Sequence, residues 1–143
     1  MCLQQMSHNN LLTEKTKMLG YCSCLLSTLL YGSEPWTTYA RQEKRLNSFH
    51  LRCLTRLLHI QWQDRVPNTE VLERAGLASM PTMLSHRRLR WLGHVHRMEP
   101  NRLPREILSG ELREGVRRTS RPLLRFKDAC KLDLKLTGIN PNN

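Results

Sequence analysis

Arginine side chains recur at helical spacing in two parts of the chain, and the chemistry they offer is phosphate binding. At about 100° per residue, one set lies within roughly 60° on a helical wheel: Arg41, Arg45, Arg52 and Arg56. A second set lies beside an apolar face: Arg87, Arg90, His94 and Arg97. A rigid helix with guanidinium groups every one or two turns can follow a nucleic-acid backbone, because each planar fork of donors suits a phosphate. The alternative is a solvated helix edge whose arginine stems cover the rim of the core.

A third cationic cluster lies in a predicted basic loop between Gly110 and Arg121. It contains Arg117, Arg118 and Arg121. The loop leads into the start of a predicted helix, where free N–H groups and the helix dipole attract phosphate. The alternative is a basic linker without a ligand.

Metal-binding residues occur in pairs with unsuitable spacing. Cys22 and Cys24 are two residues apart, as are His94 and His96. Zinc sites use other spacings, and helical residues two apart do not face each other. We therefore expect no metal site and no cofactor.

Carboxylates are too scattered to form a catalytic cluster. Asp64, Asp128 and Asp133 stand apart in the sequence, and two-metal nucleases and polymerases need clustered carboxylates. No Ser/His/Asp arrangement, phosphate-binding loop or dinucleotide motif occurs. We expect these three aspartates in surface ion pairs, and no enzymatic activity.

The composition agrees with an anionic partner. The 143 residues carry 23 Lys and Arg against 12 Asp and Glu, a net charge of +11, and 17 of the 23 cations are Arg. Most of the excess lies after residue 80, and such a concentration is typical of nucleic-acid binding, although a merely solvated basic surface is the alternative. Five scattered cysteines argue against a disulfide-stapled secreted protein and favour the nucleus or cytoplasm. The longest apolar stretch, 18–31, is interrupted by polar residues, so we expect neither a membrane span nor a signal peptide.

Apolar periodicity and cap residues predict an all-α fold, a small irregular bundle of four to five helices with a basic loop and frayed termini. The expected helices are 11–31, a second from Thr37 or Thr38 to about His59, 69–75 after an Asn68 cap, 79–98 with Ser79 as cap, a short turn to 109, and 121–137 with Ser120 as cap. Gly32, Gly76 and Gly138 are the expected stops.

Two apolar sets bear on packing. The second helix is expected to bury Leu46, Phe49, Cys53 and Leu57, and Cys130 is expected in the core as well. The first helix is apolar on more than one side, and we expect it to expose Leu25, Leu26, Leu29 and Leu30. An exposed apolar patch of this kind favours self-association through residues 11–31.

Several segments together resemble the region after the palm in the reverse transcriptases of non-LTR (LINE-type) retrotransposons. They are 25–36, which ends in LYGSEPW, 45–58, which begins RLNSFH, 62–72 (WQDRVPNTEVL), 87–95 (RRLRWLGHV) and 121–128 (RPLLRFKD). The resemblance covers residues 11–139. Pro35, Pro67 and Ser120 depart from the usual residues, as in a decayed element copy.

The resemblance implies a thumb and C-terminal fragment that lacks the catalytic palm and the endonuclease. It divides the chain into a helix that follows the palm (1–36), a thumb-like helical region (37–76) and a basic C-terminal helical region (77–143). A thumb grips the template–primer duplex through its backbone, and the stripe from Arg41 to Arg56 is where such a grip is expected. The predicted function is RNA or DNA binding with low sequence specificity. The alternatives are a non-functional retroelement remnant and a module that docks an acidic protein.

Overall fold

The computed structural model describes residues 11–110 and 124–138. All the regular secondary structure in these ranges is helical, and no strand occurs among them. The predicted all-α class is confirmed. Contacts divide the chain into two compact units. Unit 1 comprises Met1–Gly32 and Ala40–Met83, and unit 2 comprises Ser33–Tyr39 and Leu84–Asn143. The predicted frayed termini and the basic loop lie almost wholly outside the described residues.

Unit 1 begins with one continuous helical run. It consists of α2 (Glu14–Gly20), the π-helical segment η1 (Tyr21–Leu26) and α3 (Ser27–Leu29). Thr13 caps its start, since its hydroxyl accepts from the Thr16 N–H at 3.3 Å, and Gly32 follows its end with a φ of +64°. The predicted helix over 11–31 is therefore present, from Glu14 to Leu29, with a π-helical middle that the periodicity did not indicate.

The π-helical segment changes which leucines face the core. Its hydrogen bonds span five residues, so Tyr21 and Leu26, five apart, share the buried face. Leu26 and Leu30 are buried, and Leu25 and Leu29 are half-buried. The predicted exposure was therefore wrong for Leu26 and Leu30 and holds only in part for Leu25 and Leu29. Self-association through residues 11–31 stays a prediction.

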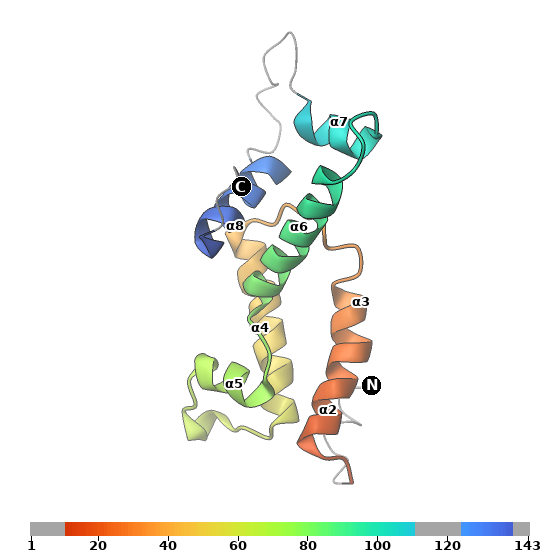
Figure 1. The fold of residues 1–143 in the computed structure, drawn as a ribbon. Coiled ribbons are helices and arrows are strands. Elements are labelled where there is room, and N and C mark those ends of the chain that lie inside the picture. The colour runs from red at the N-terminus through yellow and green to blue at the C-terminus, as the bar shows by residue number, and fades with distance from the viewer. Residues whose placement is uncertain (1–10, 111–123, 139–143) are drawn as a thin grey trace. The chain divides into compact units, whose positions relative to one another are not determined.

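Helix α4 (Ala40–Leu57) is the long helix of unit 1 and lies beside the first run (Figure 1). It begins at Ala40, later than the predicted caps. Cys53 and Leu57 are buried as predicted, and Leu46 is half-buried. Phe49 is 40% exposed, so its predicted place in the core was wrong. His50 and Leu54 are fully buried instead.

His50 connects three segments of unit 1. Its Nε2 lies 3.2 Å from the Ala78 carbonyl oxygen, and its Nδ1 lies 2.8 Å from the Tyr21 hydroxyl. Because a carbonyl only accepts, Nε2 carries the proton, and in the neutral ring Nδ1 accepts from the Tyr21 O–H. Both ring nitrogens are thus satisfied without solvent. Burial lowers the pKa of His50, although the bond to Ala78 opposes it, and burial raises the pKa of Tyr21.

Two short elements follow α4 in unit 1, and the second of them contacts α4. The 3-10 turn η2 (Trp62–Asp64) is closed by the Asp64 carboxylate, which accepts from the Gln61 N–H at 2.8 Å. Helix α5 (Asn68–Ala75) starts one residue before its predicted start and ends at Gly76 with a φ of +63°. Asn47 Oδ1 of α4 accepts from the Met80 N–H at 3.1 Å, which ties α4 to the start of α6.

Unit 2 contains most of α6 (Met80–His96), with α7 (Leu103–Ser109) and α8 (Phe126–Thr137). Ser79 caps α6 as predicted, because its hydroxyl accepts from the Thr82 N–H. Helix α8 begins at Phe126, not at the predicted Arg121, since the Asp128 carboxylate accepts from the Arg125 N–H and caps the helix there. The predicted cap Ser120 lies outside the described residues. Gly138, with a φ of +70°, ends α8 as predicted.

A buried ion pair joins α6 to α8. Arg88 Nε donates to Asp133 Oδ2 at 2.7 Å and Nη2 to Oδ1 at 3.1 Å, and both residues are about 95% buried. Arg88 Nη1 also donates to the Thr38 hydroxyl at 3.3 Å. The expectation that Asp133 lies at the surface was therefore wrong. The same two helices also meet through the Trp91 and Phe126 rings, which lie edge to face with their centroids 5.2 Å apart.

We expect unit 1 to lose stability in weak acid because of His50. Its folded-state pKa lies below the unfolded value of about 6.5, so the unfolded chain binds a proton that the folded chain does not. The free energy of unfolding should fall as pH drops below about 6.5, by at most about 1.4 kcal/mol per pH unit. Urea denaturation between pH 7.5 and 5.5, followed by circular dichroism, measures it. His50→Gln should flatten this dependence, and parallel curves for parent and variant would contradict the assignment.

We expect removal of one partner of the Arg88–Asp133 pair to destabilise unit 2. Arg88→Met leaves a buried carboxylate without its counter-ion and should cost about 3–5 kcal/mol. The double variant Arg88→Met/Asp133→Leu should recover much of this loss in chemical denaturation. Arg74→Met is the control, because the Arg74–Glu70 pair is exposed and its loss should cost less than about 1 kcal/mol. An Arg88→Met variant as stable as that control would refute the role of the pair.

Candidate nucleic-acid interface

A shallow groove of about 380 Å³ runs along the exposed side of α4. It is lined by Arg41, Lys44, Arg45, Ser48, Phe49 and Arg52. All six side chains are exposed, and three of them are arginines from the predicted stripe. Arg56, the fourth arginine of that stripe, is exposed but does not line the groove. We call this surface the α4 groove.

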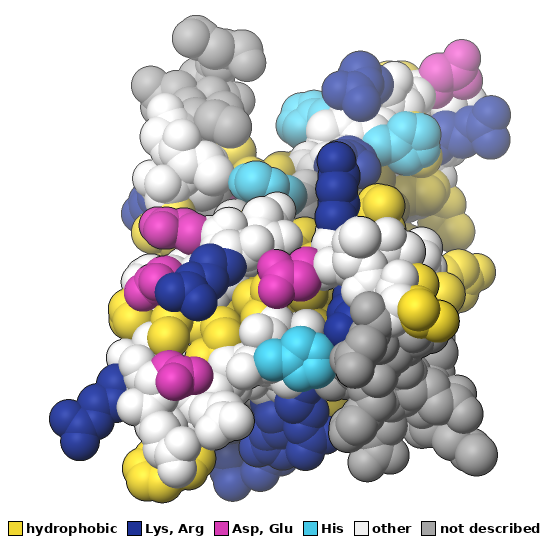
Figure 2. Space-filling model, turned by 90° about the horizontal axis from the view of Figure 1, so that it is seen from below, with side chains coloured by type: hydrophobic (Ala, Val, Ile, Leu, Met, Phe, Trp, Pro, Cys, Tyr) yellow, Lys and Arg dark blue, Asp and Glu magenta, His cyan; other side chains and the backbone are white. Residues whose placement is uncertain are grey.

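The cations of the α4 groove differ from others on the molecule in their pairing. In residues 11–110 and 124–138, ion pairs involve Arg74, Arg87, Arg88 and Arg125, and none involves Arg41, Arg45 or Arg52. Figure 2 shows one face of the molecule, where carboxylates lie near several cations while a group of Lys and Arg gathers at the lower edge. The guanidinium groups of the α4 groove are therefore available to an external anion.

The positive field of the stripe also reaches the core behind it. Burial raises the pKa of the Cys53 thiol, and the nearby charges of Arg56 and Arg52 act in the opposite direction. The field thus favours negative charge even at a buried site on the same helix.

Phe49 is the residue of the groove that the sequence analysis misassigned. It lies about 40° from Arg45 on the wheel at 100° per residue, between the apolar and cationic stripes. The periodicity is therefore compatible with a place either in the core or on the arginine face. The structure places it among the arginines, with 40% of its surface exposed. Lys44 is a further cation of the groove, and its lateral position on the wheel had left it out of the predicted site.

The residues of the second predicted stripe, on α6, differ from one another in exposure and pairing. Arg90, His94 and Arg97 are exposed on or just after α6. Arg87 is half-buried, and its Nη1 lies 3.5 Å from Glu34 Oε1. Its neighbour Arg88 is buried with Asp133. Two of the cations in this part of the chain therefore have carboxylate partners.

The predicted cationic loop residues Arg117, Arg118 and Arg121 lie outside the described residues.

The structure gathers no metal-binding cluster among the residues it describes. In these ranges no three His, Cys, Asp or Glu residues come together in a way that would hold a metal ion. Asp64 and Asp128 cap a turn and a helix, and Asp133 is paired with Arg88. Each of the three thus has a structural contact.

No described helix combines the length and apolarity needed to cross a membrane. Comparison with family models, with curated proteins and with solved structures gives no match to this chain.

Proposed function

We propose that this chain binds single-stranded RNA or DNA through the backbone phosphates, using the α4 groove, and that it derives from the thumb region of a LINE-type reverse transcriptase. The motif resemblance supports the origin. The binding proposal rests on one observation: three exposed arginines without carboxylate partners in the described ranges line one groove together with an exposed aromatic ring.

The spacing of the arginines suits a chain of phosphates. Arg41 and Arg45 are one helical turn apart, and Arg45 and Arg52 are two turns apart, which correspond to rises of about 6 and 10 Å. Arginine stems are long enough to reach phosphates on either side of these positions. Contacts of this kind hold the backbone in register and carry no direct sequence information. Binding with low sequence specificity follows.

Phe49 favours a single strand over a duplex. An exposed ring between guanidinium groups offers a stacking surface to an unpaired base, whereas the bases of a duplex are already stacked on one another. Every base has a π face, so stacking adds affinity without strong sequence preference. An acidic protein would meet the same cations, and its contact with the ring would be apolar packing in place of stacking, so the single-strand preference tested below separates the two partners.

We expect binding to weaken steeply with salt. Four cationic contacts on a single strand should give a slope of about −3 for log affinity against log salt, because each contact releases condensed counterions. Fluorescence anisotropy with a labelled 20-nucleotide oligonucleotide at several salt concentrations measures this slope. Arg45→Gln/Arg52→Gln should weaken binding to all sequences alike and flatten the slope by one to two units.

The matched control is Arg65→Gln/Arg74→Gln, which removes the same charge from exposed positions outside the groove. It should retain a slope close to that of the parent. Excess polyglutamate tests the acidic-protein alternative and should compete poorly. Binding that ignores salt, or equal effects of the two double variants, would argue against the α4 groove as the site.

We expect Phe49→Leu to weaken binding to a single strand by about tenfold, because stacking on an aromatic ring contributes about 1–3 kcal/mol per base. Duplex affinity and the salt slope should not change. Phe49→Trp should keep or raise single-strand affinity, and quenching of the new indole on binding reports the stacking directly. Equal losses for single strand and duplex with Phe49→Leu would assign Phe49 a role in folding.

A further inference from the structure

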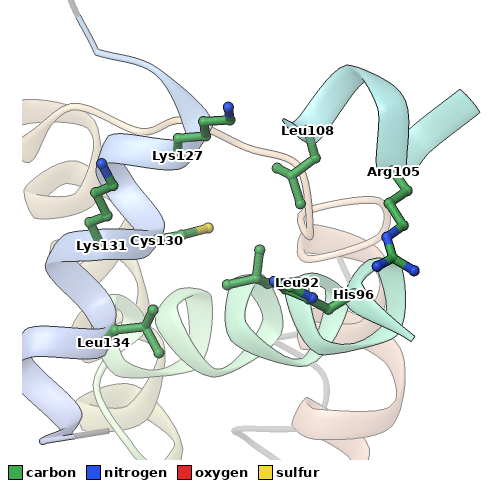
Figure 3. Close-up of a pocket in the computed structure, with 8 residues that line it drawn as sticks. All are labelled: Leu92, His96, Arg105, Leu108, Lys127, Cys130, Lys131 and Leu134. Atoms are coloured by element: carbon green, nitrogen blue, oxygen red, sulfur yellow. The ribbon is translucent and has the colours of Figure 1, made fainter. Parts of the chain in front are cut away.

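Unit 2 contains a second hollow, which shares no lining residue with the α4 groove. It has a volume of about 430 Å³, within the usual range for small-molecule sites. Three helices form its walls, with Leu92 and His96 from α6, Leu108 from α7 and Leu134 from α8 (Figure 3). We call it the unit 2 pocket.

The interior of the unit 2 pocket is apolar. Leu92, Leu108 and Leu134 are half-buried and line it together with Cys130, which is 3% exposed. Burial raises the pKa of the Cys130 thiol to about 11, so at neutral pH the sulfur is an uncharged SH group. Figure 3 shows this sulfur directed into the hollow. The interior thus offers mainly aliphatic surface, and the one ring in the lining is the imidazole of His96, an exposed residue.

The rim of the pocket is cationic. Lys127 and Lys131 lie one turn apart on α8, and Arg105 lies across from them on α7. No lining residue is a carboxylate. Within the described ranges neither lysine takes part in an ion pair. The two ammonium groups therefore stand beside an apolar hollow without a counter-charge from this part of the chain.

We propose that the unit 2 pocket binds a single-chain amphiphilic anion, such as a fatty acid, with the alkyl chain against the leucines and the head group at Lys127 and Lys131. Charge complementarity selects the anion, and the aliphatic interior selects the alkyl chain. A peptide segment of the chain itself is a poorer occupant: residues 111–123 carry four Arg and two Glu, so the cationic rim repels them. The phosphates of a nucleic acid would contact the lysines, but its polar backbone would not bury the leucines.

Calorimetric titration with dodecanoate below its micellar concentration tests the proposal. One equivalent should bind, dodecan-1-ol should bind more weakly because it lacks the charge, and acetate should not bind because it lacks the chain. Failure of dodecanoate to bind, or equal affinity for the alcohol, would overturn the proposal. Vesicles of anionic phospholipid test whether the protein binds a lipid surface in place of a free amphiphile. Binding to the vesicles without binding to dodecanoate would also overturn the proposal.

Variants divide the site into its two halves. Lys127→Gln/Lys131→Gln should lower the affinity for dodecanoate by roughly tenfold and leave the affinity for dodecan-1-ol unchanged. Leu108→Gln should lower the affinity for both ligands, since it removes part of the apolar wall of the pocket. Lys135→Gln/Arg102→Gln is the matched control, because it removes the same charge from exposed positions outside the pocket and should bind dodecanoate like the parent. Circular dichroism verifies that each variant is helical. Equal affinity in the two charge variants would place the anion elsewhere.

Discussion

The double hydrogen bond of His50 determines how α4 faces the solvent. One ring nitrogen donates to Ala78 and the other accepts from Tyr21, so the rotation of α4 about its own axis is set from two sides. Arg45 lies about 140° from His50 on the wheel, and Arg41 lies about 180° from it, at 100° per residue. An anchored imidazole on one side of the helix therefore presents the arginines on the other. Together with the buried Cys53, Leu54 and Leu57, this histidine holds one side of α4 against the core and leaves the α4 groove on the exposed side.

The cations of this protein fall into two physical classes. Arg88 is buried with Asp133, where its planar fork matches the carboxylate and joins α6 to α8. Arg87 shares its charge with Glu34 at the edge of the same helix. Arg41, Arg45 and Arg52 have no such partner among the described carboxylates. The net charge of +11 thus measures neither binding nor stability by itself, because the partner of each arginine decides what that arginine does.

The two hollows accept anions of different kinds because their surroundings differ. The α4 groove sets an aromatic ring among guanidinium groups, a combination that suits bases and phosphates. The unit 2 pocket sets lysines around aliphatic side chains, a combination that suits a charged head on an alkyl chain. Both are open to solvent, and neither includes a carboxylate in its lining.

Local spacing along the sequence was enough to predict the all-α class, the Ser79 cap at the start of α6, the glycine stops at 32, 76 and 138, and the exposed arginine face of α4. These features depend on contacts within a few residues, so periodicity and cap chemistry carry them. The tertiary structure decided the rest. Tyr21 and His50 are 29 residues apart and Arg88 and Asp133 are 45 apart, and no local pattern indicates which distant polar group will satisfy another. Phe49 shows the same limit: on a wheel it borders both stripes, and only the packing of His50 and Leu54 into the core leaves its ring among the arginines.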